Sequence, residues 1–156
     1  MRGNEVVEGR SERIGGWLIL LVVTIGVLTP LAQLGSAMTL FGNAPRLEAY
    51  FGDAWPIYCS MTLGIVALRT IICLFVAERL IRSRSSQTPR TAIIGIWIAY
   101  VILGAVSLTV SAAFSPVSMS FAEMAGRLFW QLAICIVASA YLLNSKRVAA
   151  TYSRLS

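Results

Sequence analysis

Two stretches of this chain carry no charged residue over a length that no soluble domain of this size needs. Thirty-two uncharged residues separate Arg13 from Arg46, and another 32 separate Arg90 from Glu123. The hydrocarbon core of a bilayer is roughly 30 Å thick, and a helix needs about 20 apolar residues to cross it. The pattern therefore predicts an integral membrane protein whose spans are helices.

The same pattern predicts four spans, which together form one transmembrane domain over residues 14–144. The spans cover about 16–41, 56–81, 89–114 and 121–144. The predicted fold is all-α, a bundle of four transmembrane helices. A flexible polar tail of residues 1–13 precedes the bundle, and a basic tail of residues 145–156 follows it.

Helix signals mark several span ends. Pro89 fits the first turn of the third span, with Thr88 as its N-cap. Ser120 and Glu123 have the spacing of a capping box at the start of the fourth span. Pro30 lies inside the first span, where apolar sequence continues beyond it. We therefore expect Pro30 to kink that helix rather than to end it.

Basic residues are distributed unevenly between the two sides of the predicted bundle. Arg46 and Arg127 fall on the side of the first and third loops. The opposite side, formed by the two tails and the middle loop, carries Arg2, Arg10, Arg13, Arg79, Arg82, Arg84, Arg90, Lys146, Arg147 and Arg154. Because cytoplasmic segments carry the excess of Lys and Arg, both termini are predicted to be cytoplasmic.

The first outer loop contains a short amphipathic segment. Pro45 and Gly52 delimit it, and Leu47, Tyr50 and Phe51 fall on one helical face. We expect a short interfacial helix that lies on the outer membrane surface.

Charge composition changes the expected partners. The chain has 13 Lys and Arg against 7 Asp and Glu, a formal net charge of +6. The bases lie just outside apolar spans, without interleaved aromatic residues, so the partners indicated are the lipid bilayer and anionic headgroups on the cytoplasmic side rather than nucleic acid.

The residue inventory argues against catalysis. The chain has no His, and no carboxylate lies deep inside a predicted span, so the usual groups for acid–base and metal-assisted chemistry are missing there. Cys59, Cys73 and Cys135 are widely spaced within apolar runs and are expected to be small buried hydrophobes rather than a disulfide or zinc site. We predict no catalytic, cofactor-binding or metal residues, and no cofactor.

Arg69 is the main candidate for chemistry. At 1.5 Å per residue it lies about 15–20 Å from either end of its span. A charge at that depth costs about 2.5–3.5 kcal/mol on insertion scales, and such residues usually face the bundle interior or water. Tyr100 and Thr24 lie at a similar depth, and Gln131 about one turn higher. Arg69 either bonds to carbonyls and locks the bundle, or coordinates an anion or a partner.

Glu123 and Arg127 form a second candidate pair at the outer start of the fourth span. Their spacing of four residues fits a surface ion pair beside the capping box, worth about 0.2–0.5 kcal/mol. The alternative is a gate at the outer mouth of a pathway.

The ends of the chain carry motifs that resemble a known family. Gly15, Gly16, Trp17 and Leu18 lead directly into the first span, which contains a proline, and the last span is followed by the segment 145–152. Together these features resemble the bacterial inner-membrane family called domain of unknown function 2569, from Ile14 to Tyr152. The resemblance implies a multi-pass protein of the bacterial inner membrane, and it implies no substrate, catalytic residue or cofactor.

The closing motif departs from the family in places. Residues 138–141 stand where the family often has a Trp-x-Pro-Tyr-like element, Ala149 where it commonly has Lys, and Tyr152 where it has Phe. The resemblance still singles out a candidate cytoplasmic docking tail: Ser145, Lys146, Arg147, Val148, Thr151 and Tyr152.

Two functions fit these observations. The first is a non-catalytic accessory or assembly component of the cell envelope, acting as a homo-oligomer or with a membrane-protein partner. The alternative is a small transporter that uses Arg69. Because the only deep charge is positive, its solute would be anionic or neutral.

Overall fold

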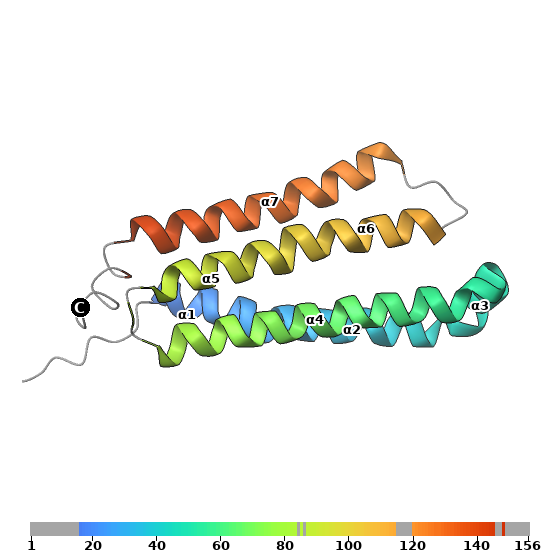
Figure 1. The fold of residues 1–156 in the computed structure, drawn as a ribbon, viewed down its shortest axis with the longest axis horizontal. Helices are drawn as coiled ribbons and strands as arrows, with labels where there is room; N and C mark the ends of the chain where they lie inside the picture. The colour runs from blue at the N-terminus through green and yellow to red at the C-terminus, as the bar shows by residue number, and fades with distance from the viewer. Residues whose placement is uncertain (1–15, 84, 86, 115–119, 146–147, 149–156) are drawn as a thin grey trace, which may run out of the picture.

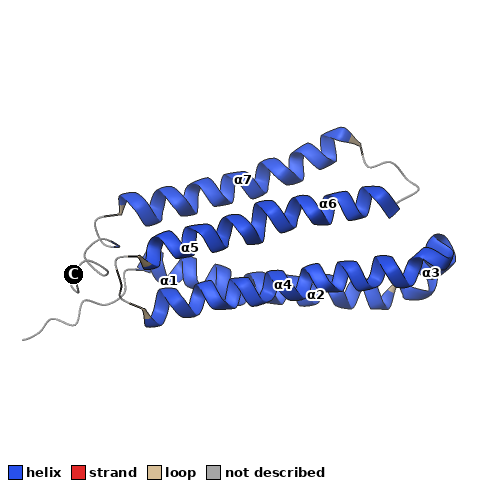
Figure 2. Ribbon diagram, viewed as in Figure 1, coloured by secondary structure: helices blue, strands red, loops and turns tan. Residues whose placement is uncertain are grey.

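The computed structural model describes residues 16–83, 85, 87–114, 120–145 and 148, and all regular structure in this part of the chain is helical (Figure 2). The first span consists of α1 (Gly16–Val23), the π-helical turn η1 (Thr24–Leu28) and α2 (Thr29–Gly42). A short helix, α3 (Ala44–Phe51), and a 3₁₀ turn, η2 (Gly52–Ala54), lead into α4 (Trp55–Arg82). The third span consists of α5 (Thr88–Trp97), the π-helical turn η3 (Ile98–Ile102) and α6 (Leu103–Phe114), and the fourth is α7 (Phe121–Asn144).

Four helical stretches among these residues are long and apolar enough to cross a membrane: Gly16–Gly42, Ala44–Arg82, Thr88–Phe114 and Phe121–Asn144. The predicted all-α fold with four membrane-spanning helices is confirmed. The chain is a multi-pass membrane protein.

The spans pack in chain order. The first span packs against α4, α4 packs against α5 and α6, and α7 packs against α5, η3 and α6 (Figure 1). The start of α1, the connection from α4 to α5 and the end of α7 lie at one end of the bundle, and α3 lies at the other (Figure 1). The first and fourth spans are therefore the outer members of the series.

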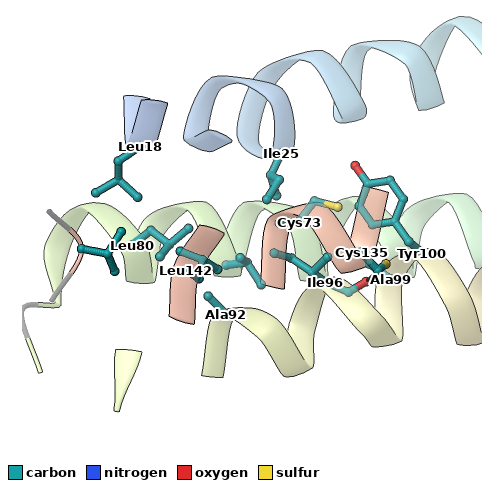
Figure 3. Packing of buried hydrophobic residues seen from close by; sticks show 13 residues of the cluster. Leu18, Ile25, Cys73, Leu80, Ala92, Ile96, Ala99, Tyr100, Cys135 and Leu142 are labelled. Atoms are coloured by element: carbon teal, nitrogen blue, oxygen red, sulfur yellow. Dashed lines mark hydrogen bonds between the residues drawn. The ribbon is translucent and has the colours of Figure 1, made fainter. Parts of the chain in front are cut away.

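The buried core is concentrated toward the end of the bundle where α1 begins. Leu18 and Ile25 of the first span share one buried cluster with Cys73 of α4 and Ile96 of α5 (Figure 3). Many large apolar side chains elsewhere are exposed, which is the arrangement expected of helices whose outer faces contact lipid.

Two glycines allow helices to approach closely. A Cβ at Gly26 would lie 2.7 Å from the Cβ of Ala77, and a Cβ at Gly95 would overlap the Cγ2 of Val76. Small residues at such positions bring helix backbones together, which is how membrane helices gain packing energy.

The first span continues through Pro30, as expected, and its local adjustment is the π-helical turn η1. A proline ring clashes with the carbonyl four residues earlier and cannot donate to it. That carbonyl belongs to Gly26, inside η1. The wider π turn accommodates both effects.

The two predicted helix starts have different outcomes. Ser120 and Glu123 form the capping box: the Glu123 N–H donates to Ser120 Oγ at 3.2 Å, and the Ser120 N–H donates to Glu123 Oε2 at 3.3 Å. The prediction for Thr88 was wrong. Thr88 is the first residue of α5 and is buried, and its hydroxyl donates to Ser83 Oγ at 3.0 Å, so it ties the α4–α5 connection instead of capping the helix.

The amphipathic segment of the first outer loop is helical, as α3. Phe51 at its end stacks on Tyr58 of α4, with 4.6 Å between ring centroids. The ring centroid of Tyr58 lies 6.0 Å from that of Phe114 in α6. Aromatic contacts thus fix α3 to the end of the bundle. Its placement on a membrane surface stays a prediction.

Candidate functional site

Arg69 lies at the middle of α4. It is 14 residues from Trp55 and 13 from Arg82, or about 20 Å from either end of the helix. Its guanidinium carbon lies over the ring of Tyr100 at 4.7 Å from the centroid. This is a cation–π contact between α4 and η3, and such contacts are strongest where water is excluded. The prediction had placed both residues at a similar depth, but it could not show that they face each other.

A hydrogen bond fixes the Tyr100 ring. The hydroxyl of Thr29 donates to the carbonyl of Thr24 at 2.9 Å and lies 2.6 Å from the hydroxyl of Tyr100. A hydroxyl has one hydrogen to donate, so Tyr100 is the donor to Thr29. The bond links the third span to the first beside Arg69, and Figure 3 shows the Tyr100 hydroxyl directed toward the first span. Thr29 was not singled out in the sequence.

An open cavity of about 560 Å³ lies between α4, η3 and α7. It is lined by Arg69, Tyr100, Glu123, Gly126, Arg127, Trp130, Gln131 and Ile134. The five polar residues predicted from sequence therefore line one cavity. Sequence analysis had treated Glu123 and Arg127 as separate from Arg69, and it did not identify Trp130 or Ile134 as lining residues.

Two buried polar atoms at this cavity have no hydrogen-bond partner among the described residues: Arg69 Nε and Gln131 Oε1. Buried polar atoms nearly always have a partner in the protein, in water or in a ligand. Because the oxygen and nitrogen of a glutamine amide are assigned by their surroundings, Gln131 can offer either a donor or an acceptor. Other atoms of both side chains line the cavity.

Gly104 of α6 makes room for the Gln131 amide. A Cβ at this position would overlap Gln131 Oε1. The absence of a side chain at Gly104 therefore sets where the amide lies.

The predicted ion pair between Glu123 and Arg127 is not formed. The carboxylate of Glu123 turns back to the N–H of Ser120, and the ion pair among the described residues is Glu78–Arg82 at 3.0 Å. Capping geometry explains the difference, because a carboxylate directed at the helix N-terminus points away from a residue one turn further along. Arg127 thus faces the cavity without a described carboxylate partner.

The candidate docking tail is described in part. Ser145 is the C-cap of α7, and its N–H donates to the Tyr141 carbonyl at 3.1 Å. Val148 is 1% exposed and belongs to the core cluster, so this residue packs against the bundle. The other members of the predicted tail, Lys146, Arg147, Thr151 and Tyr152, lie outside the described residues.

The cysteines are free thiols. Cys73 and Cys135 are buried, Cys59 is half-buried, and Cys135 Sγ lies 3.9 Å from the Ile96 carbonyl. In the described part of the chain no cluster of three His, Cys, Asp or Glu side chains could hold a metal ion.

Residues 11–153 match the family model described as protein of unknown function (DUF2569). The chain belongs to the DUF2569 family. The family predicted from the opening and closing motifs is confirmed. No curated protein and no solved structure matches the chain.

This DUF2569 protein has a second hollow, an apolar groove of about 660 Å³ between α1 and α7. It is lined by Trp17, Leu20, Leu21, Thr24, Trp130, Ala133, Ile134, Val137, Ala138 and Tyr141. Trp130 and Ile134 also line the polar cavity. The polar cavity and the apolar groove therefore meet at these two side chains.

Proposed function

We propose that this DUF2569 protein is a non-catalytic, multi-pass protein of the bacterial inner membrane that binds an anionic solute at Arg69, as a small transporter does. The observation that carries the proposal is that Arg69 and Arg127 line one cavity, and that neither forms an ion pair with a carboxylate of the described residues. A guanidinium presents its N–H groups in a planar fork that matches the oxygens of a carboxylate or a phosphate.

The charge of the cavity favours an anion. Arg69 and Arg127 contribute two positive charges and Glu123 one negative charge, which leaves one net positive charge. The Glu123 carboxylate already accepts a hydrogen bond from the Ser120 N–H, so its charge is partly satisfied at the helix N-terminus. An arginine in the middle of a span costs about 2.5–3.5 kcal/mol on insertion scales, and a bound anion offsets that cost.

The orientation that follows from the basic residues has both termini in the cytoplasm. Arg79, Arg82 and Arg90 lie at the ends of α4 and α5, at the same end of the bundle as the start of α1 and the end of α7. In this orientation Glu123 and Arg127 belong to the outer half of the membrane, and the basic end contacts anionic headgroups on the cytoplasmic side.

Anion binding is tested on protein reconstituted in lipid nanodiscs. Inorganic phosphate and small carboxylates are expected to raise the melting temperature of the wild type. Arg69→Leu should weaken that binding about 30-fold or more, because it removes one partner of a buried charge pair. Arg46→Leu is the matched control: it removes the same charge at an exposed position of α3, outside the cavity and away from the basic end of the bundle. Equal binding by the wild type and Arg69→Leu would overturn the proposal.

A second candidate is an accessory or assembly component of the cell envelope, acting as a homo-oligomer or with a membrane-protein partner. The groove between α1 and α7 favours it, because a helix from another chain has an apolar surface there to pack against. Extraction into nanodiscs followed by mass spectrometry distinguishes the two candidates. A partner at fixed stoichiometry, without ligand-dependent stabilisation, supports the accessory role.

A further inference from the structure

We infer that the anion held at Arg69 is the headgroup of an amphiphile from the surrounding bilayer, and that its alkyl chain lies in the apolar groove between α1 and α7. This inference rests on the proposed function and specifies its ligand class. The ligand combines one phosphate or carboxylate group with a long apolar chain.

The first argument is the continuity of the two hollows. Trp130 and Ile134 line both of them, so the two hollows are neighbours along the same helix, α7. Each hollow suits one half of an amphiphile. The cavity offers the guanidinium groups of Arg69 and Arg127, whereas apolar side chains make up most of the groove lining.

The second argument is lateral access. Several groove-lining side chains are highly exposed: Trp17 is 68% exposed, Leu20 is 52% exposed and Val137 is 69% exposed. Leu20 and Val137 lie within their spans and in a membrane are exposed to the hydrocarbon core, so an alkyl chain can enter the groove from the side without passing through water. A small water-soluble anion has no use for such an opening.

The third argument is the order of the two hollows along α7. Arg127 and Gln131 lie about 9 and 15 Å from the start of the helix, at 1.5 Å per residue from Phe121. The groove continues from Trp130 to Tyr141, about 16 Å further along. A headgroup at Arg69 and a chain directed toward the opposite end of the bundle match this order.

Three probes separate the parts of the ligand: hexadecyl phosphate, methyl phosphate for the headgroup alone, and hexadecanol for the chain alone. Binding to the purified protein in a nonionic detergent is measured by native mass spectrometry. Hexadecyl phosphate is expected to bind more tightly than either of the other two. A parallel titration with phosphatidic acid shows whether a two-chain membrane lipid or a single-chain amphiphile is the better source of the same chemistry.

Two pairs of variants test the two halves of the site. Arg69→Leu should weaken hexadecyl phosphate binding about 30-fold or more, whereas Arg46→Leu should leave it unchanged. Arg69→Lys keeps the charge and should retain most of the hexadecyl phosphate binding. This variant tests the role of Arg69 if Arg69→Leu does not fold. Val137→Trp narrows the groove and should weaken hexadecyl phosphate binding about tenfold, the effect of displacing roughly two buried methylenes, while methyl phosphate binding is unchanged.

Ile136→Trp is the matched control for the groove. Ile136 neighbours Val137, is also β-branched and is 57% exposed, but does not line the groove. Its substitution should leave hexadecyl phosphate binding unchanged.

The possible failures are distinguishable. If methyl phosphate binds as tightly as hexadecyl phosphate and Val137→Trp has no effect, the ligand is a soluble anion; the inference is overturned and the proposed function stands. If no phosphate probe depends on Arg69, both are overturned. If Val137→Trp instead dissociates a dimer or releases a partner protein while the probes do not bind, the groove is a protein interface and the inference is overturned.

Discussion

Replacing Gly95 by alanine tests the packing of α5 against α4 at Val76. The new Cβ would overlap the Cγ2 of Val76, which is 2% exposed. Valine in a helix has one strongly preferred χ1 rotamer, so the methyl group cannot turn away cheaply. Relief requires α4 and α5 to separate, or Val76 to leave its preferred rotamer.

The expected magnitude combines two opposing effects. Alanine is favoured over glycine in a helix by about 1 kcal/mol, which raises the free energy of unfolding. Overpacking a well-packed core typically costs about 1–3 kcal/mol, which lowers it. Gly95→Ala should therefore destabilise the protein by about 0–2 kcal/mol. Gly64 of α4 is exposed and has no atom within 4 Å of an added Cβ, so Gly64→Ala should stabilise by about 1 kcal/mol.

Reversible unfolding in mixed micelles with increasing dodecyl sulfate, followed by helical circular dichroism, measures both changes. A third measurement makes the test sharper. In a Val76→Ala background the obstructing methyl group is absent, and Gly95→Ala should then be stabilising. Equal effects of Gly95→Ala and Gly64→Ala, or an unchanged effect of Gly95→Ala in the Val76→Ala background, would show that the two helices are not in contact as described.

Three further predictions concern the site and its supports. Tyr100→Phe should lower the free energy of unfolding in dodecyl sulfate by about 0.6 kcal/mol and by no more than about 1.7, the range for hydrogen bonds between membrane helices. Tyr100→Phe combined with Thr29→Val should lower it by less than the sum of the two single changes, because both remove the same hydrogen bond. Ser120→Ala should destabilise by about 0.5–2 kcal/mol in the same assay, because the Glu123 N–H loses its side-chain acceptor; an unchanged midpoint would contradict the capping box. Arg69→Leu should leave the free energy of unfolding unchanged or raise it by about 1 kcal/mol. Removing the buried, unpartnered Nε stabilises the fold by about 1–3 kcal/mol, whereas losing the cation–π contact with Tyr100 costs about 0.5–2 kcal/mol. A loss of more than about 2 kcal/mol would show that Arg69 locks the bundle.

The spans could be predicted from sequence because a bilayer requires long apolar helices, and their charged and capped ends are local signals. Ser120 and Glu123 illustrate this, since both partners of the capping box lie within four residues of each other. Thr88 shows the limit of the same approach. Its position suits an N-cap, but Ser83 competes for its hydroxyl across the connection, and that contact depends on how α4 ends.

The composition of the cavity could be predicted only in part. Depth along a span follows from counting residues, which placed Arg69, Tyr100 and Gln131 near the middle of the bundle. Which face of each helix meets its neighbour depends on contacts between distant segments, such as that between Gly104 and Gln131. For this reason the grouping of all five polar residues, and the groove that joins them at Trp130, required the structure.

The two π-helical turns, η1 and η3, differ in their relation to the local sequence. The turn η1 has a local cause, because Pro30 disturbs the carbonyl of Gly26 within it. The turn η3 contains no proline or glycine, so its sequence, Ile98 to Ile102, would be expected to continue as an ordinary α-helix. π turns are rare and are frequent at functional sites. In η3 the wider turn carries Tyr100, whose ring contacts Arg69 and whose hydroxyl reaches Thr29. The turn thus positions a side chain that lines the cavity in which an anion is proposed to bind.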